Sequence, residues 1–451
     1  MGLRNTVAVL AAKIICRACK LAGKQGVTLA GQVALKIAPG ILRNLAGQVR
    51  KTIFVTCGTN GKTTTNNLLC SALEAEGKKV VCNRTGSNML NGVVAAFVLQ
   101  TTWMGKLDAD CACIEIDEAS AVHVFAHFKP NYMILTNLSR DQLDRYGEID
   151  ITMNILQKAI QMAPDMKIIV DGDDPLSFYL IKNSGNPFIT FGIGQPSLPE
   201  QASGTEIREG RFCKVCGAEL TYHFYHFAQL GDYECLQCGF KRPVLDFYAQ
   251  NVDTADGLSF EVNGFYIHAS YRGFYNIYNI LAAYAAARTA GFPLLHYQKV
   301  LADYHPQNGR MEQFLIQNTQ VILNLAKNPA GFNQNIAAVM DDKQSKDIII
   351  LINDNSADGT DVSWLWDVDF DRLADTNAAS VTVSGIRCRD MQLRLKYVDI
   401  PSNLQPDIEK AIREKVESGT GNLYVLVNYT GLYHTHVILT KMEEQERKKE
   451  K

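Results

Sequence analysis

The sequence predicts an α/β protein: a central domain built on a parallel sheet, with a four-cysteine insertion, followed by a Rossmann-like α/β domain. Short β-branched or apolar runs alternate with stretches of helical spacing, a pattern typical of a parallel sheet with helices on both faces. Two Cys-x-x-Cys pairs interrupt this alternation, which resumes after them. A chain of 451 residues is also too long for one hydrophobic core, so more than one domain is needed.

The central domain begins with a strand, a glycine turn and a helix. Residues 50–56 are rich in β-branched side chains, glycines follow, and residues 63–76 have helical spacing. This order forms the first unit of a parallel sheet. Later apolar runs predict further strands at 80–82, 112–116, 132–136 and 167–170, with a helix at 151–162.

The alternation breaks near residue 195, where Gly, Pro, Ser and Glu accumulate before the cysteine pairs. After the pairs, the sequence predicts strands at 258–262 and 265–269 and a helix at 276–290. A second α/β segment supplies expected strands at 320–325, 347–352, 379–383 and 422–427. We therefore expect an N-terminal helical segment (1–48), a central domain (49–312, with the cysteine insertion at about 205–247) and a C-terminal α/β domain (313–451).

Composition restricts the class of partner and the compartment. The formal charge of −2 leaves no basic excess, which argues against a nucleic-acid partner. Lys13 and Arg17 interrupt the apolar run at 6–19, whereas a membrane-spanning helix needs about 20 apolar residues. A helix packed on the protein is the first interpretation, and a helix resting on a membrane surface is the second. Twelve cysteines without an export signal indicate a reducing, cytoplasmic location.

A phosphate-binding loop follows the first strand and consists of Gly58, Thr59, Asn60, Gly61, Lys62, Thr63 and Thr64. Glycines let backbone N–H groups surround phosphate oxygens, and the helix N-terminus adds its dipole. Lys62 is expected to neutralise the β- and γ-phosphates of ATP, and the Thr63 hydroxyl to face Mg²⁺. The standard G-x-x-x-x-G-K-[ST] spacing is matched only if Thr56 is taken into the turn.

Three carboxylates stand at the end of the strand expected at 112–116, namely Glu115, Asp117 and Glu118. Carboxylates beside a phosphate loop are the hard oxygen ligands that Mg²⁺ prefers. In an extended strand Glu115 and Asp117 share one face, while Glu118 lies on the other face or past the strand end. Either Glu115 or Glu118 is expected to reach the metal, with Glu118 slightly favoured, and a purely structural acidic turn is the alternative.

The four cysteines of the insertion are Cys213, Cys216, Cys235 and Cys238, with 18 residues between the pairs. Thiolates at this spacing are typical of a tetrahedral zinc ribbon. A closed four-cysteine site has no open position for water or substrate, so a structural Zn²⁺ is expected.

A polar run at 353–361 follows the apolar residues 348–352 and contains Asp358 and Asp361. Side chains at the carboxyl end of a parallel strand lie where α/β sheets place their sites. Trp364 and Trp366 follow closely, which suits a packed surface or a partner contact. An Asn/Asp/Gly turn that caps the next helix is the alternative interpretation.

The phosphate loop resembles the GTNGKT nucleotide loop of the Mur ligases of peptidoglycan synthesis. Other stretches similar to that superfamily are Thr136-Asn137 with Asp141, Asp173-Asp174-Pro175, Gly273 with Asn276 and Asn279, and Gly309-Arg310 with Glu312. The cysteine insertion and residues 357–367 are similar to one family of this group, the MurT subunits of lipid II isoglutaminyl synthases. This similarity covers nearly the whole chain, including residues 31–36 and 144–148.

The resemblance implies an ATP-dependent ligase of peptidoglycan synthesis, with Asn276, Asn279 and Arg310 joining the loop around ATP. Such an enzyme activates the α-carboxylate of D-glutamate in the lipid II stem peptide as an acyl phosphate, and ammonia converts it to D-isoglutamine. The ammonia would come from a class-I-like glutaminase subunit, GatD, in a heterodimer that acts at the inner face of the membrane. Asp361, or else Asp358, would complete the catalytic triad of that glutaminase.

Two features depart from the general Mur pattern. Gln142 follows Asp141 where many Mur ligases have histidine, and the carbamylated lysine of a second metal site has only Lys158 as a positional counterpart. Two other functions stay open at this point. One is a Mur-type ligase that adds an amino acid to a UDP-linked precursor, and the other is a non-enzymatic zinc-ribbon module that uses ATP as a conformational switch.

Overall fold

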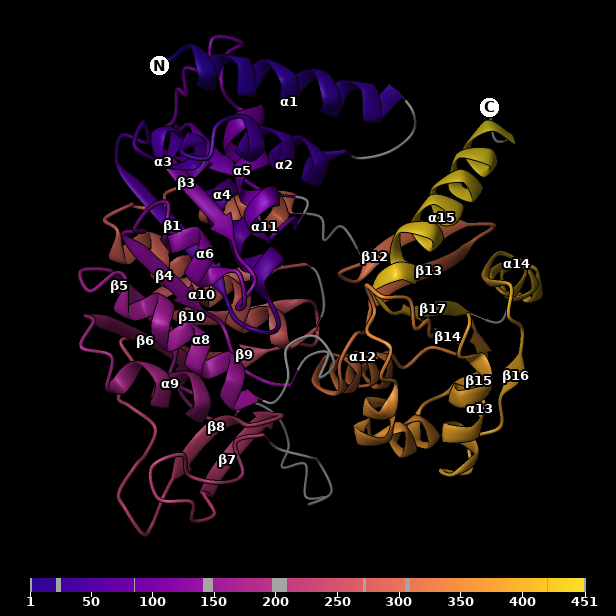
Figure 1. Cartoon of the computed structure of the whole chain (residues 1–451). Helices are drawn as coiled ribbons and strands as arrows, with labels where there is room; N and C mark the ends of the chain where they lie inside the picture. Colours follow the sequence, from indigo (N-terminus) through magenta and orange to yellow (C-terminus); the bar gives the residue numbers. More distant parts are fainter. Residues whose placement is uncertain are drawn as a thin grey trace.

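Two large sheets, a separate two-stranded hairpin and a layer of N-terminal helices make up the described part of the chain, as the computed structural model in Figure 1 shows. The structure describes residues 2–21, 26–84, 86–140, 149–196, 209–270, 273–304, 309–419 and 421–449. In these ranges the parallel sheet, the four-cysteine insertion and the C-terminal α/β sheet predicted from the sequence are all confirmed.

The central sheet has nine strands in the order β11-β10-β9-β6-β5-β4-β1-β3-β2. Its strands are β1 (Thr52–Cys57), β2 (Val80–Cys82), β3 (Cys111–Glu115), β4 (Tyr132–Leu135), β5 (Lys167–Asp171), β6 (Phe188–Ile193), β9 (Phe247–Asp253), β10 (Leu258–Val262) and β11 (Phe265–Ala269). Neighbouring strands from β9 to β2 are parallel, whereas β9, β10 and β11 form an antiparallel extension. The two runs predicted after the insertion therefore lengthen the same sheet.

Helices cover both faces of this sheet. The helices α4 (Lys62–Ala75), α10 (Tyr275–Thr289) and α11 (Tyr297–Asp303) lie on one face, and α5 (Leu90–Leu99), α6 (Ala121–Phe125), α8 (Ile149–Gln161) and α9 (Pro175–Lys182) lie on the other. Successive β1 residues point to opposite cores: Ile53 and Val55 to the α5 side, Phe54 to the α4 side. A strand buried on both faces reads as a continuous apolar run, which is why its position was predictable.

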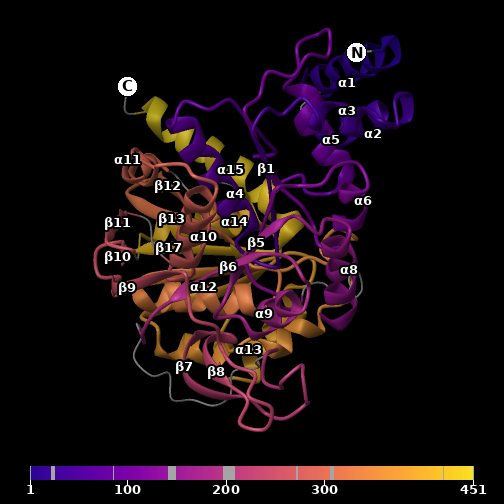
Figure 2. The ribbon, with the colours of Figure 1, turned by 90° about the vertical axis from the view of Figure 1, so that its left-hand side faces the viewer.

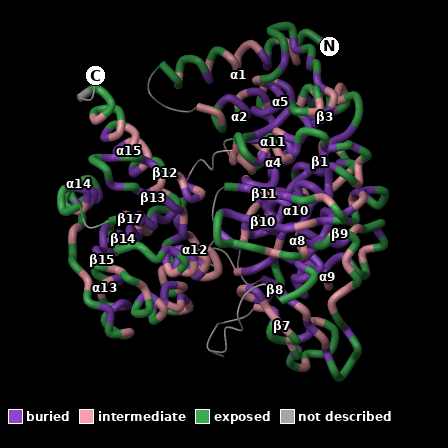
Figure 3. The backbone as a smooth tube through the Cα atoms, turned by 180° about the vertical axis from the view of Figure 1, so that it is seen from behind, coloured by how far each residue is buried: buried purple, intermediate pink, exposed green. Residues whose placement is uncertain are grey.

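The N-terminal segment forms α1 (Leu3–Leu21), α2 (Val27–Ile37) and α3 (Ile41–Ala46), which pack on α5. The inward side chains of α1 are small, with Ala8 and Ala12 fully buried. Figure 3 shows the outer side of α1 exposed. The expectation of a helix packed on the protein is therefore confirmed for its inner face. No helix in the described part of the chain is both long enough and apolar enough to cross a membrane.

The four-cysteine insertion carries the hairpin of β7 (Thr221–Phe227) and β8 (Leu230–Glu234). Its own small core joins Tyr233 and Phe240 to Phe178 of α9. Figures 1 and 2 both place this hairpin and the helices α1–α3 at opposite ends of the molecule.

The C-terminal sheet has the order β12-β13-β17-β14-β15-β16. Its elements are β12 (Glu312–Ile316), β13 (Thr319–Leu325), α12 (Pro329–Asp341), β14 (Lys346–Leu351), η1 (Ser363–Asp367), η2 (Phe370–Asp375), β15 (Ala378–Ser384), α13 (Cys388–Lys396), β16 (Asn403–Leu404), α14 (Ile408–Ser418), β17 (Asn422–Val427) and α15 (Tyr429–Lys449). The strand β13 was predicted at 320–325, whereas β12 and the turn that joins it to β13 were not. Gln317 and Asn318 form this turn with φ of 47° and 66°, the paired positive values of a type I′ turn, and Gln-Asn is a weak signal for that turn.

Candidate active site

The phosphate loop turns sharply between β1 and α4, and two positions in it accept only glycine. Gly58 has φ of 120° and Gly61 has φ of 84°. A Cβ at Gly58 would lie 2.3 Å from Thr136 Oγ1, and a Cβ at Gly61 would lie 2.1 Å from Asn279 Oδ1. The loop is thus held against the end of β4 on one side and against α10 on the other.

Residues directly after β4 fix the conformation of this loop. The Thr59 hydroxyl donates to the Ser139 carbonyl at 3.0 Å and accepts from the Ser139 N–H at 2.9 Å. The Asn60 N–H donates to Asn137 Oδ1 at 3.1 Å, and the Thr136 hydroxyl donates to the Asn60 carbonyl at 2.7 Å. The loop is therefore preorganised by the Thr136-Asn137 stretch that the sequence singled out.

The Lys62 ammonium lies back over the loop and is buried. Its Nζ donates to the Gly58 carbonyl at 2.5 Å and contacts Glu118 Oε1 at 3.0 Å. Burial raises the pKa of the Glu118 carboxyl, and the charge of Lys62 opposes this rise. Glu118 is thus the charge partner of the loop lysine.

Glu115, the last residue of β3, faces the other side of the loop. Its Oε1 accepts from Asn88 Nδ2 at 3.0 Å, whereas its Oε2 is buried and has no hydrogen-bond partner among the described residues. A Cβ at Gly86 would lie 3.6 Å from Thr63 Oγ1 and 3.7 Å from Glu115 Oε2. The hydroxyl and the carboxylate oxygen therefore border one small space, and both are donors suited to a hard cation.

Asparagines that sequence reasoning missed hold Glu115 in place. Asn83 exchanges two hydrogen bonds of 2.8 Å with the Glu115 backbone, and Asn88 binds its side chain. Both lie in the polar run after β2. The rule that drew attention to the run after β14, that polar side chains at strand ends build sites, would have found them.

The third carboxylate has a local role. Asp117 Oδ1 accepts from the Ala119 N–H at 3.0 Å, which closes the turn before α6. Glu115, Asp117 and Glu118 thus separate into a candidate metal ligand, a turn residue and a lysine partner.

A narrow cavity of about 80 Å³ lies between the loop, α10 and the C-terminal domain. Asn279 and Arg310 line it, and Asn279 Nδ2 donates to Asn276 Oδ1 at 3.0 Å. Across the cavity, Asn328 Nδ2 donates to Asn60 Oδ1 at 3.3 Å.

A second cavity, of about 440 Å³, adjoins Thr63 and Thr64 and is bordered by Arg84, Lys299 and Arg310. Arg310 therefore contributes to both spaces. A substrate in this second cavity would have access to the Thr63 side of the loop.

Other motif residues serve the framework. Asp174 caps α9 by accepting from the Leu176 and Ser177 N–H groups. Asp173 is buried, pairs with Arg242 at 2.6 Å and accepts from the Tyr278 hydroxyl at 2.7 Å.

Some of the remaining motif residues are described by the structure, and others are not. Glu312 Oε2 accepts from the Gly309 N–H at 3.1 Å, and Lys158 is exposed on α8. Asp141, Gln142 and residues 144–148 lie outside the described residues.

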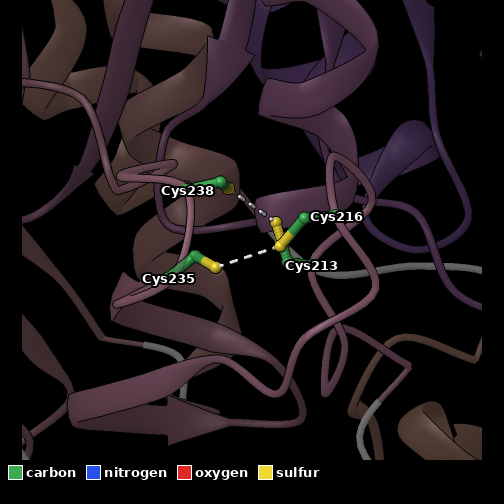
Figure 4. Close-up of side chains that lie close together, drawn as sticks. All are labelled: Cys213, Cys216, Cys235 and Cys238. Atoms are coloured by element: carbon green, nitrogen blue, oxygen red, sulfur yellow. Dashed lines mark hydrogen bonds between the residues drawn. The ribbon is translucent and has the colours of Figure 1, made fainter.

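The four cysteines of the insertion converge (Figure 4). Cys213 Sγ lies 3.5 Å from Cys238 Sγ, and Cys216 Sγ lies 3.5 Å from Cys235 Sγ. All four sulfur atoms lie within 4.8 Å of one another. This cluster could hold a metal ion, and its assembly from two Cys-x-x-Cys turns was predicted.

The two aspartates after β14 differ in exposure. Asp358 is buried and accepts from the Thr430 N–H at 2.7 Å and the Thr430 hydroxyl at 2.5 Å, at the start of α15. Asp361 is exposed and accepts from the Ser363 N–H at 2.8 Å. Hydrogen bonds from Ser363 lower the pKa of Asp361, so its carboxylate stays ionised.

The loop after β14 also meets the central domain. Asp367 Oδ2, at the end of η1, lies 3.3 Å from Arg140 Nη2. Arg140 directly follows Ser139, which holds Thr59 of the phosphate loop. Trp366 beside it is half exposed, and its ring centroid lies 5.1 Å from that of Tyr397.

Known proteins resemble the chain over nearly its full length. Residues 55–234 match the Mur ligase middle domain family, and residues 325–432 match the MurT ligase C-terminal family. The chain is 36% identical to the lipid II isoglutaminyl synthase (glutamine-hydrolyzing) subunit MurT of Staphylococcus aureus (strain COL), over 95% of this chain and 96% of that protein. It is 32% identical to the subunit of the same description from Streptococcus pneumoniae (strain ATCC BAA-255 / R6), over 98% of both.

Solved structures share the fold. A pseudomurein peptide ligase type C from Methanothermus fervidus has a TM-score of 0.69 at 20% identity, covering 88% of this chain and 80% of that one. MurF ligase from Thermotoga maritima, solved in complex with ADP, has a TM-score of 0.64 at 14% identity, covering 94% and 85%. The fold implied by the resemblance is thus confirmed.

Proposed function

This chain belongs to the MurT family, and from that premise we propose that it is the ATP-dependent synthetase subunit of a lipid II isoglutaminyl synthase. It amidates the α-carboxylate of D-glutamate in the lipid II stem peptide. The observation that carries the proposal is the convergence of the Lys62 ammonium, the Thr63 hydroxyl and the Glu115 carboxylate around one glycine loop. Such a loop suits transfer of a phosphoryl group to a carboxylate.

The reaction has two steps. The substrate carboxylate attacks the γ-phosphorus of ATP, which releases ADP and leaves an acyl phosphate. Ammonia then attacks the acyl carbon and expels phosphate, which leaves the amide. Lys62 and the N-terminus of α4 offset the charge on the transferred phosphoryl group, and Asn279 and Arg310 border the space for the rest of the nucleotide.

Glu115 is the better candidate for the Mg²⁺ ligand in this scheme. Its buried Oε2 points to the space beside Thr63, whereas the Glu118 carboxylate is engaged by Lys62. Mg²⁺ held by Glu115 and Thr63 would offset the negative charge of the phosphates. The preference for Glu118 drawn from strand phase is therefore reversed here.

Glu115→Gln should raise the Mg²⁺ concentration needed for half-maximal ADP release by at least about tenfold, since one charged ligand is lost. The matched variant is Glu118→Gln, which should shift this concentration by less than about twofold, because Glu118 faces Lys62. A larger shift for Glu118→Gln than for Glu115→Gln would return the metal to Glu118.

The cysteine cluster is proposed to bind a structural Zn²⁺. Four thiolates at this spacing match its preferred tetrahedral set, and they leave no position for a substrate. The Zn²⁺ would fasten the β7–β8 hairpin, whose small core rests on α9.

A separate glutaminase of the class-I type, GatD, is the proposed source of ammonia and the second subunit of a heterodimer. The C-terminal domain offers it the exposed carboxylate of Asp361. A carboxylate that orients a histidine completes a cysteine-based triad. Trp366 and Tyr397 lie exposed in the same domain and pack edge to face, and aromatic residues are enriched where proteins bind.

Asp361→Asn should lower glutamine-driven amidation on the order of 10³–10⁴-fold, because an uncharged side chain fails to orient the partner histidine. Amidation driven by added ammonium should stay within about twofold, since the ligase site is untouched. Both rates are followed as amide formed on the stem peptide. The comparison variant is Asp358→Asn. If Asp358→Asn lost the glutamine-driven rate and Asp361→Asn kept it, Asp358 would be the residue that orients the partner histidine.

The reaction is tested with the full chain, ATP, Mg²⁺, ammonium chloride and lipid II in detergent. The expected products are ADP and D-isoglutamine in the stem peptide, in equal amounts by chromatography and mass spectrometry. Peptide-bond formation on a UDP-linked precursor, with no amide on lipid II, would replace this proposal with an amino-acid ligase. The proposed place of action is the cytoplasmic face of the membrane, where the lipid-linked substrate resides.

A further inference from the structure

The outward face of α1 carries the larger apolar side chains of that helix. The exposed ones recur at the spacing of one helical stripe: they are Leu3, Val7, Ile14 and Leu21. Leu3 is 84% exposed and Leu21 is 91% exposed, whereas the fully buried inward residues include Ala8 and Ala12. Large apolar side chains are usually buried. These four are exposed although Ala8, Val9 and Ala12 of the same helix are buried, so the stripe is available to contact an apolar phase outside the protein.

A tryptophan and a methionine extend this stripe. Trp103 and Met104 are exposed in the segment that follows α5. Arg17 of α1 stacks on Trp103, with its Cζ 4.5 Å from the ring centroid, and Lys13 Nζ lies 5.4 Å from the same centroid. Tryptophan flanked by basic side chains is the composition found at the membrane–water interface.

The charge of the segment selects the kind of surface. Residues 1–50 contain eight Lys and Arg and no Asp or Glu, whereas the rest of the chain contains 37 Lys and Arg against 47 Asp and Glu. Arg4, Arg17 and Lys20 are exposed on α1 itself. Basic side chains beside an apolar stripe are attracted to anionic lipid head groups. Two copies of this face would instead bring like charges together.

We propose that the outward face of α1, with Trp103 and Met104, docks on the anionic surface of a lipid bilayer. The helix would lie in the interface with its small residues still packed on α2 and α5 (Figures 1 and 3). The helix α5, on which α1 packs, begins at Leu90, just after the Asn88 that holds Glu115. This inference rests on the proposed function for its purpose, since a lipid-linked substrate must be met at the membrane.

The test is co-sedimentation of the full chain with vesicles, without ATP or a partner. Binding is expected to vesicles of phosphatidylcholine with about 30% phosphatidylglycerol and not to pure phosphatidylcholine, and to weaken as salt rises from about 0.05 M to about 0.5 M. The double variant Ile14→Glu/Leu21→Glu should lower the bound fraction at least about tenfold. The matched control is Val244→Glu/Leu295→Glu, which alters two equally exposed side chains elsewhere and should bind as the unaltered chain does.

Three results would overturn the proposal. They are equal binding by Ile14→Glu/Leu21→Glu, no binding to anionic vesicles, and a dimer in solution that the same variant converts to a monomer. The last would make a second copy the occupant of this face. Amidation of lipid II in detergent does not need vesicle binding, so failure here would leave the ligase proposal standing, and failure of the ligase assay would leave this one.

Discussion

Lys62→Ala should lower ATP-dependent amidation by at least about 10²–10³-fold, an effect of ~2.7–4 kcal/mol on the barrier. Its ammonium is the buried positive charge of the loop. Without it, the negative charge that develops on the transferred phosphoryl group would no longer be stabilised. The measurement is the rate of ADP release with lipid II and ammonium, with the glutaminase left out. Because the substitution weakens stabilisation of the transition state for phosphoryl transfer, raising the ATP concentration should not restore the rate.

Two controls separate lost chemistry from lost folding. Removal of Lys62 leaves Glu118 buried without its partner, so thermal unfolding of the variant should be compared with that of Lys62→Ala/Glu118→Gln. Lys79→Ala removes an exposed lysine that pairs with Asp108 and should keep the full rate. A Lys62→Ala rate within about threefold of the unaltered chain would contradict a catalytic role for the loop.

Cys235→Ser should abolish metal binding by the ribbon and unfold it locally. Structural zinc contributes apparent binding free energies of ~10–16 kcal/mol in small zinc domains, and the ribbon has only the small core around Tyr233, Phe240 and Phe178 besides. Metal content by mass spectrometry should fall from one zinc per chain to about none. Limited proteolysis should then cut between residues 209 and 246 in the variant, and in the unaltered chain after chelation.

The matched control for this variant is Cys388→Ser, a buried cysteine of the C-terminal domain. It should lower stability slightly and keep the metal. Unchanged zinc content in Cys235→Ser, or unchanged protease resistance after chelation, would contradict a structural metal in the ribbon.

Strands buried on both faces, such as β1, β3, β4 and β14, were predicted to within a few residues, because such strands leave continuous apolar runs. No strand was predicted at β6, β9, β12 or β16. The four cysteines were equally predictable, since their spacing alone brings them together. The turn between β12 and β13 was missed because its residues, Gln317 and Asn318, adopt positive φ that their types rarely signal.

The division of roles among the acidic residues was beyond the reach of the sequence. Lys62 meets Glu118 across 56 residues, and Thr430 meets Asp358 across 72. The alternation of side chains along a strand predicts which face of the sheet each one lies on. It does not predict which residue, distant in the sequence, each side chain contacts. Only the assembled contacts separate Glu115 from Glu118, and Asp361 from Asp358.

The narrow cavity beside the loop has a mechanical consequence. At about 80 Å³ it is smaller than the ~300–1,000 Å³ of usual ligand pockets, so binding of a nucleotide inside it would require its two walls to move apart. Arg140 is fixed to one wall and Asp367 to the other, and Asp361 holds the start of the same 3₁₀ helix. Widening of the cavity would therefore either lengthen the Arg140–Asp367 ion pair or move the 3₁₀ helix η1 together with Arg140. Movement of this 3₁₀ helix would therefore also shift the loop that carries Asp361.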